Sequence, residues 1–203
     1  RLARATAAAG EAALAVAGGD GTINEVINGL AGGHTALAVI PLGTANVFFA
    51  ELGLPRAPGD IAALAARGTR RSIHLGVVAP AGGPRRRFSI MAGVGLDAHI
   101  VANLSIRLKR ATGKFAYVWQ ALVEWVRLQP RRYRVTADGV DYDCASAIVA
   151  KGRYYAGRYV AAPDASPERD SFELVLFERG GRLDVLRYAL ALGLGRLAKA
   201  RGG

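Results

Sequence analysis

The chain has 203 residues, a hydrophobic content of 51% and a mean hydropathy of +0.18. This is enough apolar material to bury a sizeable core in one large or two small domains. Charged residues interrupt every apolar stretch before it reaches the roughly 20 residues that cross a membrane, and no signal peptide is visible, so we expect a cytoplasmic protein. The single cysteine, Cys144, excludes an internal disulfide and a cysteine-based metal cluster.

The formal net charge is +11, and the positive charge is unevenly distributed. Residues 67–134 contain fourteen Lys and Arg residues against Asp97 and Glu124, whereas the residues before them are more acidic than basic. Since each Lys or Arg near an anionic bilayer contributes about 1 kcal/mol of binding, we expect peripheral association with an anionic membrane. Solubilising surface charge is the alternative. Nucleic acid is not an expected partner, because the basic clusters lack interleaved aromatic side chains.

The first predicted strand leads into a glycine-rich turn. The apolar run 12–17 is typical of a strand buried on both faces, and apolar residues at helical spacing from Ile23 predict a helix. Thr22 and Glu25 have the spacing of a capping box that would begin this helix. Between strand and helix, glycines leave backbone N–H groups open to a ligand, and the helix N-terminus adds partial positive charge. The turn predicts a phosphate-binding loop, with an ordinary α/β turn as the alternative.

Asp20 lies inside this loop, where a carboxylate would repel a phosphate. A cation placed between them removes the repulsion, and Mg²⁺ is commonly bound by one or two carboxylates together with substrate phosphates. We therefore expect Asp20 to hold Mg²⁺ with its water, or to orient the transferred phosphate through it.

A second strand–loop–helix unit follows. Residues 35–40 predict another buried strand, P-L-G-T-A-N occupies 41–46, and a helix is predicted at 47–52. Two such units in succession place both loops at the carboxyl edge of one parallel sheet, where open α/β sheets bind ligands. The candidate nucleotide-binding residues are Gly18, Gly19, Asp20, Gly21, Thr22, Asn24, Glu25, Gly43, Thr44 and Asn46.

After the short helix predicted at 61–67, the pattern changes to β, and we place a domain boundary between 69 and 70. Asp138-Gly139 between two alternating segments predicts a hairpin. The further strands and helices are predicted at 70–79, 86–93, 145–150 and 172–177, and at 98–111 and 114–129. In the last helix we expect one apolar stripe to pack in the core, with a lipid contact as the alternative; its members are Phe115, Val118, Trp119, Leu122 and Val126.

Four segments spread over most of the chain form a recognisable set. They are G-G-D-G-T-I-N-E-V at 18–26, P-L-G-T-A-N at 41–46, A-G-V-G-L-D-A at 92–98, and A-P-D-A-S at 162–166 with Asp170. Together they resemble the diacylglycerol kinase catalytic family, which includes bacterial lipid kinases and the sphingosine and ceramide kinases. G-G-D-G-T is shared with NAD kinases, whereas N-E-V and P-L-G-T-A-N indicate the lipid-kinase branch.

The resemblance implies an NAD kinase/diacylglycerol kinase-like α/β fold. Residues 1–69 would form a Rossmann-like nucleotide-binding unit with a parallel sheet, and 70–203 a mostly antiparallel, β-sandwich-like, lipid-binding domain. The implied activity is transfer of the γ-phosphoryl group of ATP to the hydroxyl of a diacylglycerol-like lipid, with Mg²⁺ as cofactor. The resemblance also implies a structural Mg²⁺ at Asp170, flanked by the carbonyls of Pro167 and Phe172; from its residue type alone, Asp170 would equally support a turn. A homodimer is left open.

Four positions depart from the family pattern. Val47 and His74 replace residues that are commonly Asp in the family, Ser171 replaces a Gly, and Lys151 stands where the family often has Asn. The first two departures remove carboxylates that help to order metal and water near the phosphates. They indicate either lost activity or a divergent subfamily.

Two family segments do not occur in this sequence: an N-terminal N-P-x-S-G-like loop and a C-terminal D-G-E-like segment with the catalytic base. We therefore expect a fragment that lacks both ends and is inactive alone, with the general base beyond Gly203. Two other functions stay open. An NAD kinase-like enzyme is disfavoured by segments 24–26 and 41–46, and a non-catalytic nucleotide-responsive module at an anionic membrane is favoured by Val47, His74 and the basic middle of the chain.

Overall fold

A computed structural model describes residues 1–103, 114–127, 129 and 131–197. The first half contains α1 (Leu2–Ala8), β1 (Ala13–Gly18), α2 (Asp20–Gly29), β2 (Ala36–Pro41), α3 (Val47–Glu51), α4 (Pro58–Arg67), β3 (Gly76–Val78), β4 (Arg86–Phe88), β5 (Met91–Val94) and α5 (Leu96–Ala102). The second half contains α7 (Lys114–Val126), β6 (Tyr133–Ala137), β7 (Val140–Cys144), β8 (Ser146–Ala150), β9 (Tyr154–Tyr155), β10 (Tyr159–Val160), β11 (Glu173–Phe177) and α8 (Arg182–Gly193).

The N-terminal part is built on the parallel pair β1–β2, as predicted. The register runs from Ala13 opposite Ala36 to Gly18 opposite Pro41. Val16 is buried, but the alanines that alternate with it are exposed, so the prediction that β1 is buried on both faces is wrong. The physical reason is that α2 packs its buried residues Ile23 and Ile27 against the Val16 side of the strand, and the alanines face outward.

Helix α2 begins earlier than its sequence predicts. Its N-cap is Gly19 and its first residue is Asp20, so Thr22 and Glu25 do not form the expected capping box. A carboxylate in the first turn is favoured by the helix dipole, which supports the earlier start. The Thr22 side chain instead covers Gly18, where an added Cβ would lie 2.7 Å from Thr22 Cβ, and Glu25 pairs with Arg86.

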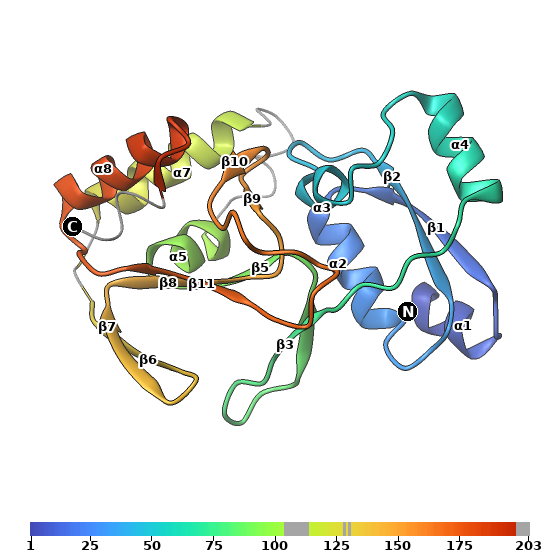
Figure 1. The fold of residues 1–203 in the computed structure, drawn as a ribbon, viewed down its shortest axis with the longest axis horizontal. Coiled ribbons are helices and arrows are strands. Elements are labelled where there is room, and N and C mark those ends of the chain that lie inside the picture. The colour runs from blue at the N-terminus through green and yellow to red at the C-terminus, as the bar shows by residue number, and fades with distance from the viewer. Residues whose placement is uncertain (104–113, 128, 130, 198–203) are drawn as a thin grey trace.

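The C-terminal part is antiparallel. Strands β11, β8 and β5 form one sheet in that order, while β3–β4, β6–β7 and β9–β10 are separate two-stranded pairs. The predicted hairpin is confirmed: Asp138 and Gly139 both have positive φ, at 51° and 79°, as a primed two-residue turn requires. The strand predicted at 70–79 is confined to β3, and the one predicted at 86–93 is divided into β4 and β5. Figure 1 shows α5, α7 and α8 grouped beside the three-stranded sheet.

Helix α7 does not bury the predicted apolar stripe. Trp119, Leu122 and Val126 are 58%, 49% and 55% exposed, so the expectation of core packing is wrong for these three residues. Phe115 and Val118 are stripe members whose side chains lie outside the described ones. Trp125, off the stripe, donates its indole N–H to the carbonyl of Arg182 at 2.9 Å, because α7 faces α8 with that side. None of the helices within the described ranges is long and apolar enough to cross a bilayer.

Two clusters of buried apolar residues stabilise the fold. The first contains Val16, Ile23, Ile27, Val39, Val47, Phe48, Phe49 and Ile90. The second contains Ile148, Ala150, Ala162, Ala165 and Val175. Met91 packs against both clusters. The boundary between 69 and 70 stays a prediction, and packing of Ile90 in the first cluster crosses it.

A buried carboxylate joins the two parts of the molecule. The Glu51 side chain, at the end of α3, is 2% exposed. Its Oε2 accepts hydrogen bonds from the backbone N–H groups of Arg153 (2.8 Å) and Tyr154 (3.1 Å), and its Oε1 accepts one from Arg153 Nε at 3.3 Å. Glu51 therefore fixes the position of α3 against the turn that follows β8.

We expect Glu51→Gln to lower the free energy of unfolding by about 1–3 kcal/mol. The amide has no negative charge, and its NH₂ group would face N–H donors of Arg153 and Tyr154 that then lack an acceptor. Urea denaturation monitored by circular dichroism measures the change. Glu11→Gln, at an exposed position, is the matched control. Equal stability of the two variants would contradict the structural role of Glu51.

Candidate active site

The two predicted loops meet at the carboxyl ends of β1 and β2. The backbone is closest at Gly19 and Gly43, where a Cβ added to Gly43 would lie 2.4 Å from the Gly19 Cα. The Leu42 N–H also donates to the Gly18 carbonyl at 3.0 Å, which extends the β1–β2 pairing to the loops. The structure therefore brings residues 18–25 and 43–46 to one sheet edge, as the sequence predicts.

Asn46 holds the second loop in shape. Its Oδ1 accepts a hydrogen bond from the Gly43 N–H at 2.8 Å, and its Nδ2 donates to the Gly43 carbonyl at 2.7 Å. Asn46 itself has a left-handed backbone, with φ of 49°, which Asn tolerates better than most residues. Both ends of its amide thus contact the loop backbone, whereas Thr44, on the same loop, is exposed to solvent.

Asp20 links the first loop to the helix after the second. Its Oδ1 accepts a hydrogen bond from the Phe48 N–H at 2.9 Å, which satisfies one of the N-terminal donors of α3. Val47, one of the departures from the family pattern, is buried in the first apolar cluster. Position 47 therefore contributes packing where a carboxylate was expected.

The remaining residues of the first loop differ in exposure. Gly21 and Thr22 are exposed and Asn24 is half-buried. Glu25 forms an ion pair with Arg86, at the start of β4, so its side chain is directed at the β-rich part of the molecule. Next to this pair, Asn28 exchanges two hydrogen bonds with the Arg87 backbone, each 2.8 Å long. These contacts attach α2 firmly to β4.

A second polar group of interest surrounds the loop 166–172. Lys151, directly after β8, is 1% exposed, and its ammonium group donates to the carbonyls of Arg169 and Ser171, the latter at 3.1 Å. Burial lowers the pKa of Lys151, and the Asp170 carboxylate opposes that shift. Asp170 is 90% exposed, and its Oδ1 lies 3.4 Å from His74 Nδ1. The backbone N–H of His74 donates to the Pro167 carbonyl at 2.7 Å.

The two expected Mg²⁺ positions differ in how well they suit the ion. Asp20 offers one carboxylate beside a loop built for phosphate, which is enough when phosphates and water complete the coordination sphere. At the 166–172 loop, the Lys151 ammonium group contacts the carbonyls of Arg169 and Ser171, and a histidine contacts Asp170. Both contacts disfavour a divalent cation beside Asp170. No group of three or more His, Cys, Asp or Glu in the described part of the chain could hold a metal. Metal binding through Pro167, Asp170 and Phe172 stays an untested prediction.

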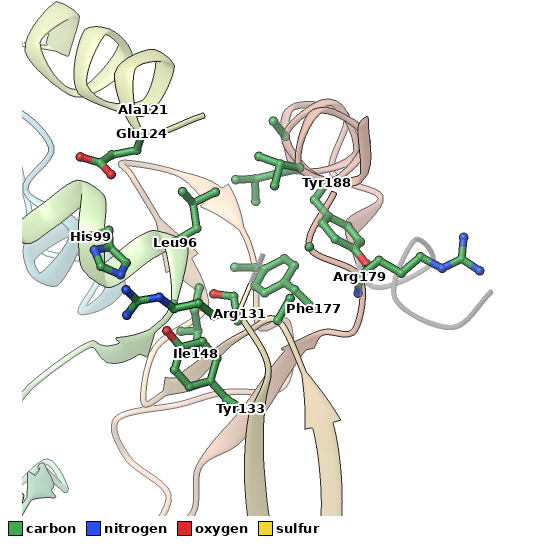
Figure 2. Close-up of a pocket in the computed structure, with 18 of the residues that line it drawn as sticks. Leu96, His99, Ala121, Glu124, Arg131, Tyr133, Ile148, Phe177, Arg179 and Tyr188 are labelled. Carbon is green, nitrogen blue, oxygen red and sulfur yellow. The ribbon is translucent and has the colours of Figure 1, made fainter. Parts of the chain in front are cut away.

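Sequence reasoning missed an apolar cavity of about 380 Å³ in the β-rich part. It lies between the three-stranded sheet and helices α5, α7 and α8, and Figure 2 shows Leu96, Phe177 and Tyr188 directed into it. Phe177 and Tyr188 contact edge to face, with ring centroids 5.0 Å apart. Its lining residues come from seven elements spread over residues 95–197, so no local pattern in the chain could have indicated it. Its position beside the sheet suits an apolar ligand.

We expect Gly43→Ala to lower the free energy of unfolding by about 1–3 kcal/mol, because the new methyl group overlaps the Gly19 backbone. Gly21→Ala is the matched control in the facing loop, because its Cβ meets nothing within 4 Å and alanine favours a helix. Thermal unfolding of both variants measures the difference. If Gly43→Ala were as stable as Gly21→Ala, the close approach of the two loops would contribute nothing to the free energy of unfolding.

Comparison with known proteins gives two family matches. Residues 1–78 match the diacylglycerol kinase catalytic domain. Residues 89–200, more than half of the chain, match the YegS C-terminal NAD kinase beta sandwich-like domain.

Individual relatives agree. The chain is 30% identical over 190 residues to a diacylglycerol kinase of Mycobacterium tuberculosis, covering 92% of this chain and 61% of the relative. It is 33% identical over 198 residues to a diacylglycerol kinase of Bacillus subtilis (91% and 63% coverage), and 34% identical over 169 residues to a probable lipid kinase YegS-like protein of Pseudomonas aeruginosa (81% and 54%). The chain thus spans 54–63% of the length of these relatives.

The fold agrees as well. The crystal structure of a diacylglycerol kinase from Bacillus anthracis superposes with a TM-score of 0.65 at 22% sequence identity, over 92% of this chain and 62% of that one. This likeness confirms the expected fold, with a parallel α/β part followed by antiparallel sheets. By its sequence matches, the chain belongs to the diacylglycerol kinase and YegS-like lipid kinase family.

Proposed function

We propose that this chain is part of an ATP-dependent lipid kinase, which transfers the γ-phosphoryl group of ATP to the hydroxyl of a diacylglycerol-like lipid. The observation that carries the proposal is the close approach of Gly19 and Gly43, which places two phosphate-type loops and the Asp20 carboxylate at one sheet edge. Family membership supports the same reaction class.

The described residues would act mainly by positioning the nucleotide. Backbone N–H groups at the start of α2, together with the positive end of the helix, suit the phosphates. Asp20 would hold Mg²⁺, which when bound neutralises developing charge on the phosphates. The hydrogen bond from the Phe48 N–H fixes the Asp20 carboxylate in advance, so little reorganisation is needed on binding.

The apolar cavity is the proposed site for the lipid. Its volume of about 380 Å³ lies within the range typical of small-molecule pockets, roughly 300–1,000 Å³. Apolar residues such as Leu96, Ile148 and Phe177 suit an acyl chain, and the polar His99, Glu124 and Arg131 suit a glycerol or headgroup. An apolar and a polar side in one cavity fit an amphipathic substrate.

Exposed leucines on α8 favour docking at a membrane surface. Leu183, Leu186, Leu190 and Leu194 are 47–81% exposed, and Arg187 and Arg196 lie among them. Apolar side chains accompanied by arginine are typical of a helix that lies at an anionic interface. Of the basic residues that the sequence indicated for this role, Arg86 is paired with Glu25 and residues 107–113 lie outside the described ones. Peripheral association is thus proposed through α8 as well.

The proposed reaction is tested by incubating the full-length protein with labelled ATP and separate acceptors: diacylglycerol in anionic vesicles, a short-chain soluble diacylglycerol, a sphingoid base and NAD. We expect label in diacylglycerol. Asp20→Asn should reduce kcat at least about 100-fold with an unchanged melting temperature, because the amide oxygen still accepts from Phe48 N–H but the charge is lost.

Asp60→Asn, in the exposed first turn of α4, is the control and should keep full activity. Label in NAD alone would replace the proposal with an NAD kinase-like activity. Transfer to none of the acceptors would favour the non-catalytic nucleotide-responsive module. Activity of Asp20→Asn within tenfold of wild type would remove the role of this carboxylate.

The lipid site makes a separate prediction. Ala121→Phe, in the wall of the cavity, should raise the KM for a long-chain diacylglycerol roughly tenfold or more without changing the KM for ATP, because the ring occupies space for the acyl chain. Ala63→Phe, on exposed α4, is the matched control. An equal KM for lipid in both variants would place the lipid elsewhere.

A further inference from the structure

Lys151 is the most deeply buried charged residue in the described part of the chain, with 1% of its surface exposed. Its backbone N–H donates to the Ile90 carbonyl at 2.7 Å, so the residue is fixed at the end of β8. Its ammonium group reaches the 166–172 loop and donates to two carbonyls of that loop. A buried ammonium is stable only when such partners replace its water.

The two carbonyls belong to Arg169 and Ser171, which lie on either side of Asp170. The loop backbone therefore curves around the ammonium group and directs two oxygen atoms at one cation. The Phe172 ring lies 5.6 Å from Lys151 Nζ, measured to the ring centroid, and stacks on Phe88 with centroids 6.0 Å apart. A cation near an aromatic face gains further electrostatic attraction.

The other groups of this loop also have protein partners. The Asp170 carboxylate pairs with the His74 imidazole, and the backbone N–H of His74 donates to the Pro167 carbonyl. His74 thus contacts the Asp170 carboxylate and the Pro167 carbonyl, and Lys151 contacts the two carbonyls on either side of Asp170. A divalent cation placed at these carbonyls would lie a few ångströms from the Lys151 ammonium group, and this like charge is unfavourable because Lys151 is buried.

We propose that Lys151 is the built-in cation of the 166–172 loop, so that this loop is ordered by an ammonium group and needs no divalent metal. In this arrangement Lys151 ties β8 to the loop, and His74 holds the exposed side through Asp170 and Pro167. The proposal does not depend on the lipid-kinase activity, because it concerns only how this loop is ordered.

Hydrogen exchange followed by mass spectrometry tests the proposal on the nucleotide-free full-length protein, read on peptides that cover residues 164–173. In the wild type we expect the same exchange rate in MgCl₂ and in EDTA at matched ionic strength. Lys151→Met should speed exchange of this segment about tenfold or more in both solutions, because two buried carbonyls lose their donor. Arg158→Met, at an exposed position, is the control for loss of one positive charge and should change nothing.

Lys151→Asn separates the ammonium from a metal. It removes the cation and supplies an amide oxygen, so we expect fast exchange in EDTA and slower exchange in MgCl₂. Slower exchange of the wild-type segment in MgCl₂ would overturn the proposal, because the loop would then bind the metal with Lys151 in place. Unchanged exchange in Lys151→Met would also overturn it. The wild-type comparison needs no variant, so it decides the question even if a substitution prevents folding.

Discussion

The buried carboxylate of Glu51 is the contact on which the arrangement of the site depends. It belongs to α3, the helix that follows the second phosphate-type loop, and it accepts hydrogen bonds from the turn after β8. Lys151 lies two residues before Arg153 on that turn and reaches the 166–172 loop. Glu51 and Lys151 therefore form a continuous connection from the candidate nucleotide loop, through one turn, to a loop of the β-rich part. A carboxylate and an ammonium hold their positions without water because each is surrounded by backbone groups of the opposite polarity.

Preorganisation explains why the candidate loops use polar side chains on their own backbone. Asn46 closes the second loop on Gly43, and Asp20 joins the first loop to the N-terminus of α3. Asn46 uses the Gly43 N–H to hold the second loop, so the donors that suit a ligand are those at the start of α2, and backbone groups lose little conformational freedom when a ligand binds. A loop of this kind selects its ligand by shape and charge. It suits phosphate groups, which are held by many weak donors.

Local signals in the sequence predicted the local structure, and contacts between distant residues decided the rest. The β1–β2 pairing follows from two strand–loop–helix patterns, and the hairpin follows from Asp138-Gly139. The capping pattern predicts too late a start for α2, because the Asp20 carboxylate favours an earlier first turn and the Thr22 side chain packs over Gly18. Exposure of Trp119 on α7 depends on which face meets α8, and the partners of Lys151 lie 18 and 20 residues away. The loops of the site could thus be predicted from the sequence, whereas the long-range contacts that hold them and the apolar cavity could not.

Several arginines stabilise the fold, which the net charge alone does not indicate. Arg86 pairs with Glu25, Arg153 with Glu51 and Arg71 with Glu168, and each pair joins segments far apart in sequence. Other guanidinium groups donate to backbone carbonyls: Arg132 to Glu178 and Arg182 to Val126, each at 2.7 Å. A guanidinium with several donors suits both kinds of partner. Three of the arginines in the basic middle of the chain, Arg71, Arg86 and Arg132, thus hold loops and strands together, so the attraction to an anionic surface depends on where the other arginines lie. On α8, Arg187 lies among exposed leucines, so this face combines positive charge with apolar surface.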